Sequence, residues 1–217
     1  MSKPFSHIGV IVVDIQGDFT EAKEGSLAVS GTDMAFIEKI ADTTRMLKED
    51  GFTIFATQDW HPEDHVSFHT NHIAKEPFDV VTVDDRTQVL WPPHWVRGTE
   101  NAVILLDTNS FHSIIRKGQD KRYDSYSGYQ DDGGRKTEMA SILEQHGIEK
   151  VVVYGLATDY CVRATALDAL QIGHKVMVIK ELCRGVAPDT STDALEEMKK
   201  AGVIVTNLLD IDMIKSF

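Results

Sequence analysis

Residues 137–179 read TEMASILEQHGIEKVVVYGLATDYCVRATALDALQIGHKVMVI, and this stretch decides the fold. Segments 137–146 and 158–172 have helical periodicity. Each is followed by a glycine and then by a short apolar run, at 151–154 and at 175–179. Glycine commonly ends a helix in the left-handed conformation, so each glycine marks a junction between a helix and a strand. The stretch therefore predicts two consecutive units, each a helix followed by a strand.

The same order of helix, glycine and strand occurs once before and once after this stretch, within residues 33–57 and 190–206. The predicted strands are continuous apolar runs without alternation, which is typical of a parallel sheet covered on both faces. We therefore predict an α/β three-layer sandwich, a doubly wound and mostly parallel sheet with helices on both faces. The six predicted strands are 9–15, 52–57, 112–117, 151–154, 175–179 and 203–206.

Length, composition and charge favour one soluble domain over residues 1–217, and they exclude several classes of function. The chain is 42% hydrophobic and 26% charged, which is ordinary for a globular protein. A net charge of −12 repels phosphate backbones and anionic lipids, so we expect neither a nucleic-acid nor a membrane partner. Two cysteines, no recognisable signal peptide and no apolar run of bilayer length favour a reduced, cytoplasmic location. The protein could form a homo-oligomer, and the sequence does not decide this.

A long segment after the second strand, at about 59–99, breaks the rhythm of helices and strands. It holds four prolines, several histidines and tryptophans, and no clear helical period. Long loops in compact domains are usually functional, so we expect this excursion to contribute to a site.

Several predicted strands carry a reactive side chain at the carboxyl end. In open α/β sheets, sites form beyond the carboxyl ends of the strands. Asp14, Lys117 and Cys161 would supply a proton acceptor, a cation and a nucleophile there. Cys161 lies where a strand turns into a helix, with Thr158 or Asp159 as the expected N-cap, and a helix N-terminus stabilises a thiolate. Cys183 is interpreted as a buried hydrophobic residue.

The excursion also carries a candidate metal site. Asp59 and His61 are two residues apart, so in an extended chain their side chains point the same way. His94 follows two prolines that present it rigidly, and it is a candidate third ligand. A carboxylate with imidazoles suits Zn²⁺, Fe²⁺ or Mn²⁺. His65 is a further candidate ligand or a loop residue.

Five motifs together carry a family resemblance. The motifs are DIQGDF at 14–19, DWHP at 59–62, WPPH at 91–94, RKG at 116–118 and GLATDYCV at 155–162. In this order along the chain, they resemble the nicotinamidase/pyrazinamidase branch of the isochorismatase-like hydrolases, from residue 8 to about 206. The resemblance implies a Rossmann-like strand order, a triad of Asp14, Lys117 and Cys161, and one divalent metal ion, zinc before iron or manganese. The implied metal ligands are Asp59, His61 and His94.

The resemblance also implies how a substrate is held. It suggests a cis peptide between Leu156 and Ala157, which aims the backbone amides of Ala157 and Cys161 at an oxyanion. A pyridine ring would lie between Phe19 and Trp91, with Tyr126 nearby. The sequence departs from the family pattern at residues 17 and 95, where this chain has Gly17 and Trp95; the family often has a cysteine at the second position. Trp95 is expected to narrow or reshape the pocket mouth.

The activity implied by the resemblance is hydrolysis of nicotinamide to nicotinate and ammonia through a cysteine thioester, within NAD salvage. Pyrazinamide is expected to be a second substrate. Two alternatives stay open. One is another cysteine amidohydrolase of the same superfamily, and the other is a non-catalytic metal-binding α/β protein.

Overall fold

The structure is a computed structural model that describes residues 5–217, and its main sheet has six parallel strands. If these six strands are numbered 1 to 6 along the chain, their order across the sheet is 3-2-1-4-5-6. The predicted α/β sheet and its Rossmann-like order are confirmed. Across the sheet the strands are β5 (Ser113–Lys117), β2 (Thr53–Asp59), β1 (Ile8–Val13), β6 (Lys150–Leu156), β7 (Lys175–Arg184) and β8 (Ile204–Thr206).

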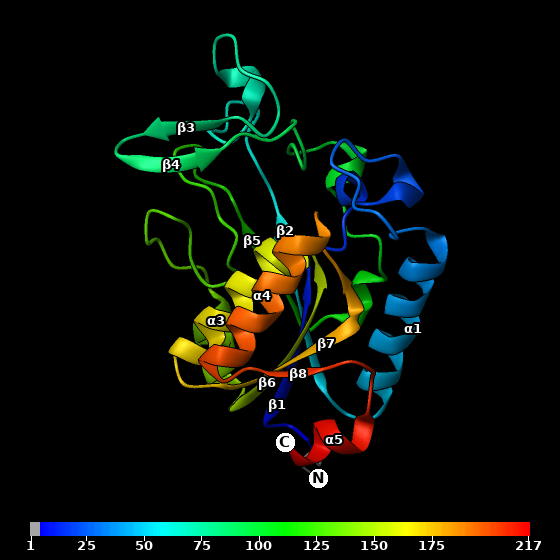
Figure 1. The fold of residues 1–217 in the computed structure, drawn as a ribbon. Coiled ribbons are helices and arrows are strands. Elements are labelled where there is room, and N and C mark those ends of the chain that lie inside the picture. The colour runs from blue at the N-terminus through cyan, green and yellow to red at the C-terminus, as the bar shows by residue number, and fades with distance from the viewer. Residues whose placement is uncertain (1–4) are drawn as a thin grey trace.

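Helices cover both faces of this sheet. Figure 1 shows α1 (Met34–Glu49) on one side and both α3 (Arg163–Gln171) and α4 (Pro188–Ala201) on the other. Because neither face meets water, β1 can consist entirely of buried residues, as its sequence IGVIVV does. The remaining α-helices are α2 (Met139–Gln145) and α5 (Ile211–Ser216).

The glycines expected to end helices do so. Gly51, Gly147, Gly173 and Gly202 have φ of 99°, 64°, 106° and 110°, a region that favours glycine. The four junctions between helix and strand therefore lie where the sequence predicts them.

Short helical turns lie mostly in the connections between these elements. The one that follows β6 is π-helical and contains Cys161. The 3₁₀ turns are η1 (Gly17–Phe19), η2 (Glu21–Lys23), η3 (His69–Asn71), η4 (Glu100–Ala102) and η5 (Thr108–Ser110), and the π-helical turn is η6 (Thr158–Val162).

Three features differ from the sequence-based expectation. The excursion contains an antiparallel hairpin of β3 (Val80–Val83) and β4 (Arg86–Val89), which is too short and too exposed to give a clear hydrophobic period. Strand β7 continues to Arg184, past a register shift in its pairing with β6. Helix α5 buries only Ile214, so its amphipathic signal is weak.

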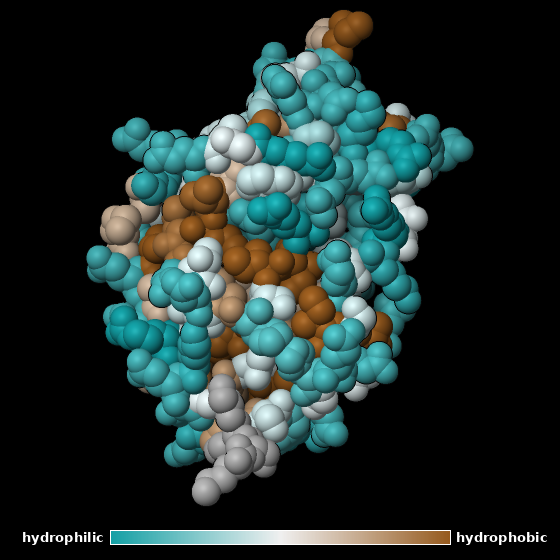
Figure 2. Space-filling model, turned by 180° about the vertical axis from the view of Figure 1, so that it is seen from behind, coloured by the Kyte–Doolittle hydropathy of each residue, from teal (hydrophilic) through white to brown (hydrophobic). Residues whose placement is uncertain are grey.

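The outer surface has one extended apolar area in the view from behind. Figure 2 shows hydrophobic residues gathered in a band across the middle of that face. Apolar surface of this kind is typical of protein contact sites, and the homo-oligomer stays a prediction. No helix among residues 5–217 is long and apolar enough to cross a membrane.

The strand order reverses between β1 and β6, where Gly155 allows close packing. Gly155 pairs with Val13 and has φ of 133°. A Cβ atom built on Gly155 would lie 2.1 Å from the backbone oxygen of Val13, and a backbone atom in a central sheet cannot move away cheaply. The residues that follow these two strands, which include Asp14 and Cys161, are therefore brought to the same crevice.

The first prediction concerns this packing. Gly155→Ala should lower the free energy of unfolding by about 3 kcal/mol or more, because steric overlap adds to an unfavourable φ. Gly173→Ala is the matched control: its φ is also positive, but no atom lies within 4 Å of the added methyl group. Urea unfolding should show a loss of about 1–2 kcal/mol for the control. Equal losses in the two variants would show that close packing at Gly155 is not limiting.

Candidate active site and metal centre

Four strands of the sheet deliver polar side chains to one edge. Asp14 directly follows β1, Asp59 ends β2 and Lys117 ends β5. Cys161 lies in η6, directly after β6. All four residues are buried, with Asp14 at 0% and Cys161 at 2% exposure. The carboxyl ends of parallel strands thus assemble the three residues predicted as a triad, together with one predicted metal ligand.

The ammonium group of Lys117 lies at the centre of this group. Its Nζ is 3.0 Å from Asp14 Oδ2 and 2.8 Å from Asp59 Oδ2. The same Nζ donates a hydrogen bond of 2.7 Å to the backbone oxygen of Ser125 and lies 3.5 Å from Cys161 Sγ. One cation therefore contacts both carboxylates and the thiol.

Burial and charge set the protonation states here. Burial would lower the pKa of Lys117, but Asp14 and Asp59 outweigh it and raise the pKa well above its ordinary value, so the lysine is charged. Burial also raises the pKa of Asp14 above its ordinary value, although Lys117 opposes the shift. Burial raises the pKa of the Cys161 thiol well above its ordinary value despite Lys117. The thiolate stabilisation expected from a helix N-terminus is outweighed, and the resting group is a thiol.

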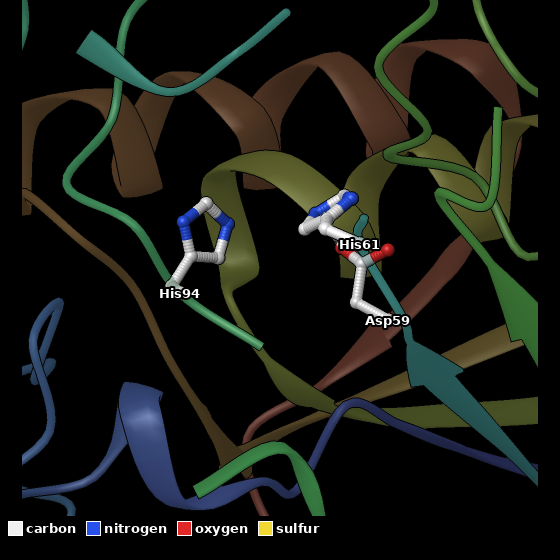
Figure 3. A group of neighbouring side chains, drawn as sticks. All are labelled: Asp59, His61 and His94. Atoms are coloured by element: carbon white, nitrogen blue, oxygen red, sulfur yellow. Dashed lines mark ion pairs between the residues drawn. The ribbon is translucent and has the colours of Figure 1, made fainter. Parts of the chain in front are cut away.

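The three predicted metal ligands lie together beside Lys117. Ligand atoms of Asp59, His61 and His94 all lie within 4.8 Å of one another, and Figure 3 shows the three side chains grouped. Backbone hydrogen bonds join the end of the excursion to its beginning. His61 N–H donates to the oxygen of Trp95, and Arg97 N–H donates to the oxygen of His61. This pairing brings His94 close to two residues more than 30 positions earlier in the chain.

The ring orientations suit a metal ion. The Nδ1 of His61 lies 2.9 Å from the Gly118 oxygen, and the Nδ1 of His94 lies 2.8 Å from the Pro92 oxygen. Each Nδ1 carries the proton that it donates to a carbonyl, so in the neutral ring that binds a metal ion each Nε2 has a free lone pair. Asp59 Oδ1 and His61 Nε2 are buried and have no hydrogen-bond partner. Two free imidazole nitrogens and one free carboxylate oxygen fit a divalent ion such as Zn²⁺.

His65 is bound on both sides by protein groups. Its Nδ1 is 2.7 Å from Ser67 Oγ and accepts from the Ser67 N–H, and its Nε2 is 3.1 Å from the Tyr123 oxygen. The ring packs 4.1 Å from the ring of His61, measured between centroids. With both nitrogens engaged, His65 packs against the candidate ligand His61 and lies outside the group of three.

A small cavity adjoins both the thiol and the metal ligands. Its walls include all three expected substrate residues, Phe19, Trp91 and Tyr126, together with Tyr160 and Cys161. The cavity volume is about 20 Å³, which holds roughly one water molecule. A pyridine ring is larger, so the aromatic side chains must move apart to admit one. The predicted cis peptide between residues 156 and 157 is present, and Ala157 is fully buried.

Asp159 has a different role from the expected N-cap. The N-cap of η6 is Ala157, and no side chain caps it. The Asp159 carboxylate instead accepts from the N–H of Val186 at 3.0 Å, the N–H of Ala187 at 3.1 Å and Thr190 Oγ1 at 2.5 Å. It therefore ties the turn that carries Cys161 to the start of α4. The expectation was wrong because a local pattern does not show which distant helix a carboxylate reaches.

Two more carboxylates near the cavity were missed. Asp124 lines the cavity and accepts from Gln88 Nε2 at 3.0 Å, which links the wall to β4. Asp18 Oδ2 accepts from the backbone N–H of Trp95 at 2.6 Å. That bond holds Trp95 at a φ of 48°, which costs about 1–2 kcal/mol for a bulky residue. The only sequence signal for these two carboxylates is that they lie in loops that carry motifs. That position does not distinguish a residue that lines the cavity from one that is exposed to solvent.

Comparisons with known proteins identify the family of this chain. The sequence matches the family model of the isochorismatase domain over residues 9–210. The chain is 40% identical to a nicotinamidase of Acinetobacter baylyi over 205 residues, which cover 93% of this chain and 92% of that protein.

Two solved structures share the fold. A nicotinamidase/pyrazinamidase of Acinetobacter baumanii has a TM-score of 0.86 and 36% identity, covering 96% of this chain and 98% of the other. A pyrazinamidase of Pyrococcus horikoshii in complex with zinc has a TM-score of 0.78 and 36% identity, covering 92% and 98%. Because the family model matches most of this chain, the chain belongs to the isochorismatase-domain family.

Proposed function

We propose that this protein is a metal-dependent nicotinamidase, which hydrolyses nicotinamide to nicotinate and ammonia and also accepts pyrazinamide. The observation that carries the proposal is the buried Lys117 ammonium, which contacts Asp14, Asp59 and the Cys161 thiol beside three grouped metal ligands. The names of the similar proteins support the substrate. The reaction supplies nicotinate for NAD salvage.

Cys161 is the proposed nucleophile and Asp14 the proposed general base. As Sγ bonds to the carboxamide carbon, its proton passes to Asp14, and the carbonyl electron pair moves onto oxygen. The backbone amides of Ala157 and Cys161 are proposed to hold this oxyanion. When the carbonyl reforms, the C–N bond breaks, and Asp14 gives its proton to the departing nitrogen. Ammonia and a thioester result.

Water then completes the reaction. Asp14 takes a proton from the water as its oxygen bonds to the thioester carbon, and the C–S bond breaks. The sulfur regains a proton from Asp14, and nicotinic acid ionises to nicotinate. Lys117 stays charged throughout and stabilises the carboxylate form of Asp14 between proton transfers.

Asp59, His61 and His94 are the proposed ligands of one divalent ion, with zinc first and Fe²⁺ or Mn²⁺ as alternatives. The zinc in the Pyrococcus horikoshii structure supports this choice. When bound, the ion supplies an electrophilic anchor for the ring nitrogen of the substrate. His65 is proposed as a support for His61. Phe19 and Trp91 are proposed to sandwich the ring, with Tyr126 closing the pocket.

We also propose that residues 1–217 form one domain, in which the excursion at about 59–99 provides the metal and substrate loop. A cytoplasmic location stays a prediction. The alternatives from the sequence, another cysteine amidohydrolase or a non-catalytic metal-binding protein, are separated by one assay. Ammonia release from nicotinamide, measured with and without a chelator, supports the proposal; its absence with a metal-loaded protein would favour an alternative.

The second prediction tests the nucleophile. Cys161→Ala should lower ammonia release from nicotinamide by at least about 10³-fold, because no thioester can form. Metal content, measured by elemental analysis, should not change. Cys183→Ala is the control, because that thiol is buried, donates to the Ile179 oxygen and lies outside the cavity; it should keep its activity. Normal turnover by Cys161→Ala would refute the covalent mechanism.

The third prediction tests the metal ligands. His94→Ala should reduce bound zinc to well below one ion per chain and raise KM, because one of three protein ligands is lost. Asp59→Ala should do the same. His112→Ala is the control, since that exposed histidine lies before β5 and away from the site. Unchanged metal stoichiometry in His94→Ala and Asp59→Ala would overturn the assignment.

The fourth prediction concerns pH. Asp14 must be ionised to accept a proton, and burial raises its pKa, so kcat/KM should fall as pH decreases through a value above 3.8, the ordinary pKa of aspartate. The measurement is kcat/KM against pH at saturating zinc, with recovery checked after return to neutral pH. An acid limb at or below the ordinary pKa of aspartate would contradict the role of Asp14.

A further inference from the structure

One residue of the cavity wall has an unpartnered donor, after the proposed triad and metal ligands are accounted for. Among residues 5–217, six buried side-chain nitrogen or oxygen atoms have no hydrogen-bond partner. Three belong to Asp14, Asp59 and His61, where the reaction or the metal ion explains them. Of the other three, which are Trp95 Nε1, Tyr129 Oη and Arg163 Nε, only Trp95 belongs to a residue that lines the cavity.

The structure holds Trp95 firmly in that position. Its ring lies 4.0 Å from the ring of Phe19 and 4.9 Å from the ring of His94, measured between centroids. Its backbone has a φ of 48° and is held by the 2.6 Å hydrogen bond to the buried Asp18 carboxylate. The side chain is 1% exposed. A bulky residue kept in an unfavourable conformation, with a buried and unpaired N–H, is typical of a site that meets a ligand.

The size of the cavity indicates what that N–H meets. About 20 Å³ admits roughly one water molecule, and Trp95 Nε1 is itself buried, so a ligand reaches this N–H only when the aromatic side chains move apart. A bound pyridine carboxamide fills the space that opens, and the N–H then needs an acceptor on the ligand. Because the metal ion is proposed to bind the lone pair of the ring nitrogen, the remaining acceptor on nicotinamide is its carbonyl oxygen. A ligand without a suitable acceptor would leave the buried donor unpaired and would be disfavoured.

We propose that Trp95 is a specificity-determining residue, whose indole N–H donates a hydrogen bond to the carbonyl oxygen of the bound pyridine carboxamide. This inference rests on the function proposed above and adds a substrate contact that the triad and the metal ligands do not supply. Phe19 and Trp91 offer the substrate aromatic surface, and Trp95 adds a directional contact.

The test measures binding without turnover. In a Cys161→Ala background loaded with zinc, calorimetry compares nicotinamide binding with Trp95 intact and with Trp95→Phe, which keeps the aromatic packing and removes the N–H. The dissociation constant should rise about tenfold in the Phe variant, with unchanged zinc content. Tyr129→Phe is the matched control, because it removes another buried, unpartnered donor away from the cavity and should leave binding unchanged.

A second ligand locates the acceptor. Benzamide has the carbonyl oxygen and lacks the ring nitrogen. Trp95→Phe should weaken the binding of both ligands by the same factor, whereas a loss for nicotinamide alone would overturn the assignment to the carbonyl oxygen. An unchanged dissociation constant for nicotinamide in Trp95→Phe would overturn the inference while leaving the proposed function intact. Failure of the wild-type protein to release ammonia would instead refute the function itself.

A second measurement applies if Trp95→Phe folds poorly. The chain has three tryptophans, so their indole N–H resonances can be followed by ¹⁵N NMR in the Cys161→Ala protein. Trp60→Phe and Trp91→Phe identify the Trp95 resonance by elimination. It should move downfield as nicotinamide saturates the protein, as expected for a new hydrogen bond. A resonance that stays in place at saturation would overturn the inference.

Discussion

The buried ammonium of Lys117 is the interaction on which the site depends. Removing a charge from water costs several kcal/mol, and close opposite charges are needed to offset it. Asp14 at 3.0 Å and Asp59 at 2.8 Å provide them, and the Ser125 oxygen accepts a further hydrogen bond. Loss of one partner of a buried pair typically costs 3–5 kcal/mol, so these side chains are constrained together. The lysine connects the proposed catalytic residues, Asp14 and Cys161, to the proposed metal ligand Asp59.

The two oxygens of Asp59 have different surroundings. Oδ2 lies 2.8 Å from Lys117 Nζ and 3.4 Å from His61 Nε2, whereas Oδ1 is buried without a hydrogen-bond partner. A divalent ion on Oδ1 would balance the second carboxylate that Lys117 alone cannot neutralise. Metal binding at the proposed site would therefore be coupled to the charge around Asp14 through one carboxylate, since a change at either oxygen alters the field at the other. The same strand end positions both oxygens, because Asp59 is the last residue of β2.

The end of the excursion at about 59–99 is hydrogen-bonded to its beginning, and this contact completes the candidate site. Backbone hydrogen bonds join His61 to Trp95 and Arg97, and further bonds join Trp91 to Ser67 and His69. These pairs align the WPPHW segment against the start of the loop, which places His94 among the ligands and Trp91 and Trp95 in the cavity wall. The loop is therefore ordered by long-range backbone pairing, and its aromatic residues supply the apolar surface that a pyridine ring requires.

The sequence by itself determined the α/β sheet, because buried parallel strands need continuous apolar runs and glycines mark the ends of helices. It also placed Asp14, Lys117 and Cys161 at strand ends, and parallel strands bring such ends to one edge. Only the tertiary structure decided how Asp59 divides its oxygens, why both nitrogens of His65 are occupied, and which helix Asp159 reaches. These depend on hydrogen bonds between residues far apart in the chain, such as Trp95 with Asp18, and local periodicity carries no information about such partners.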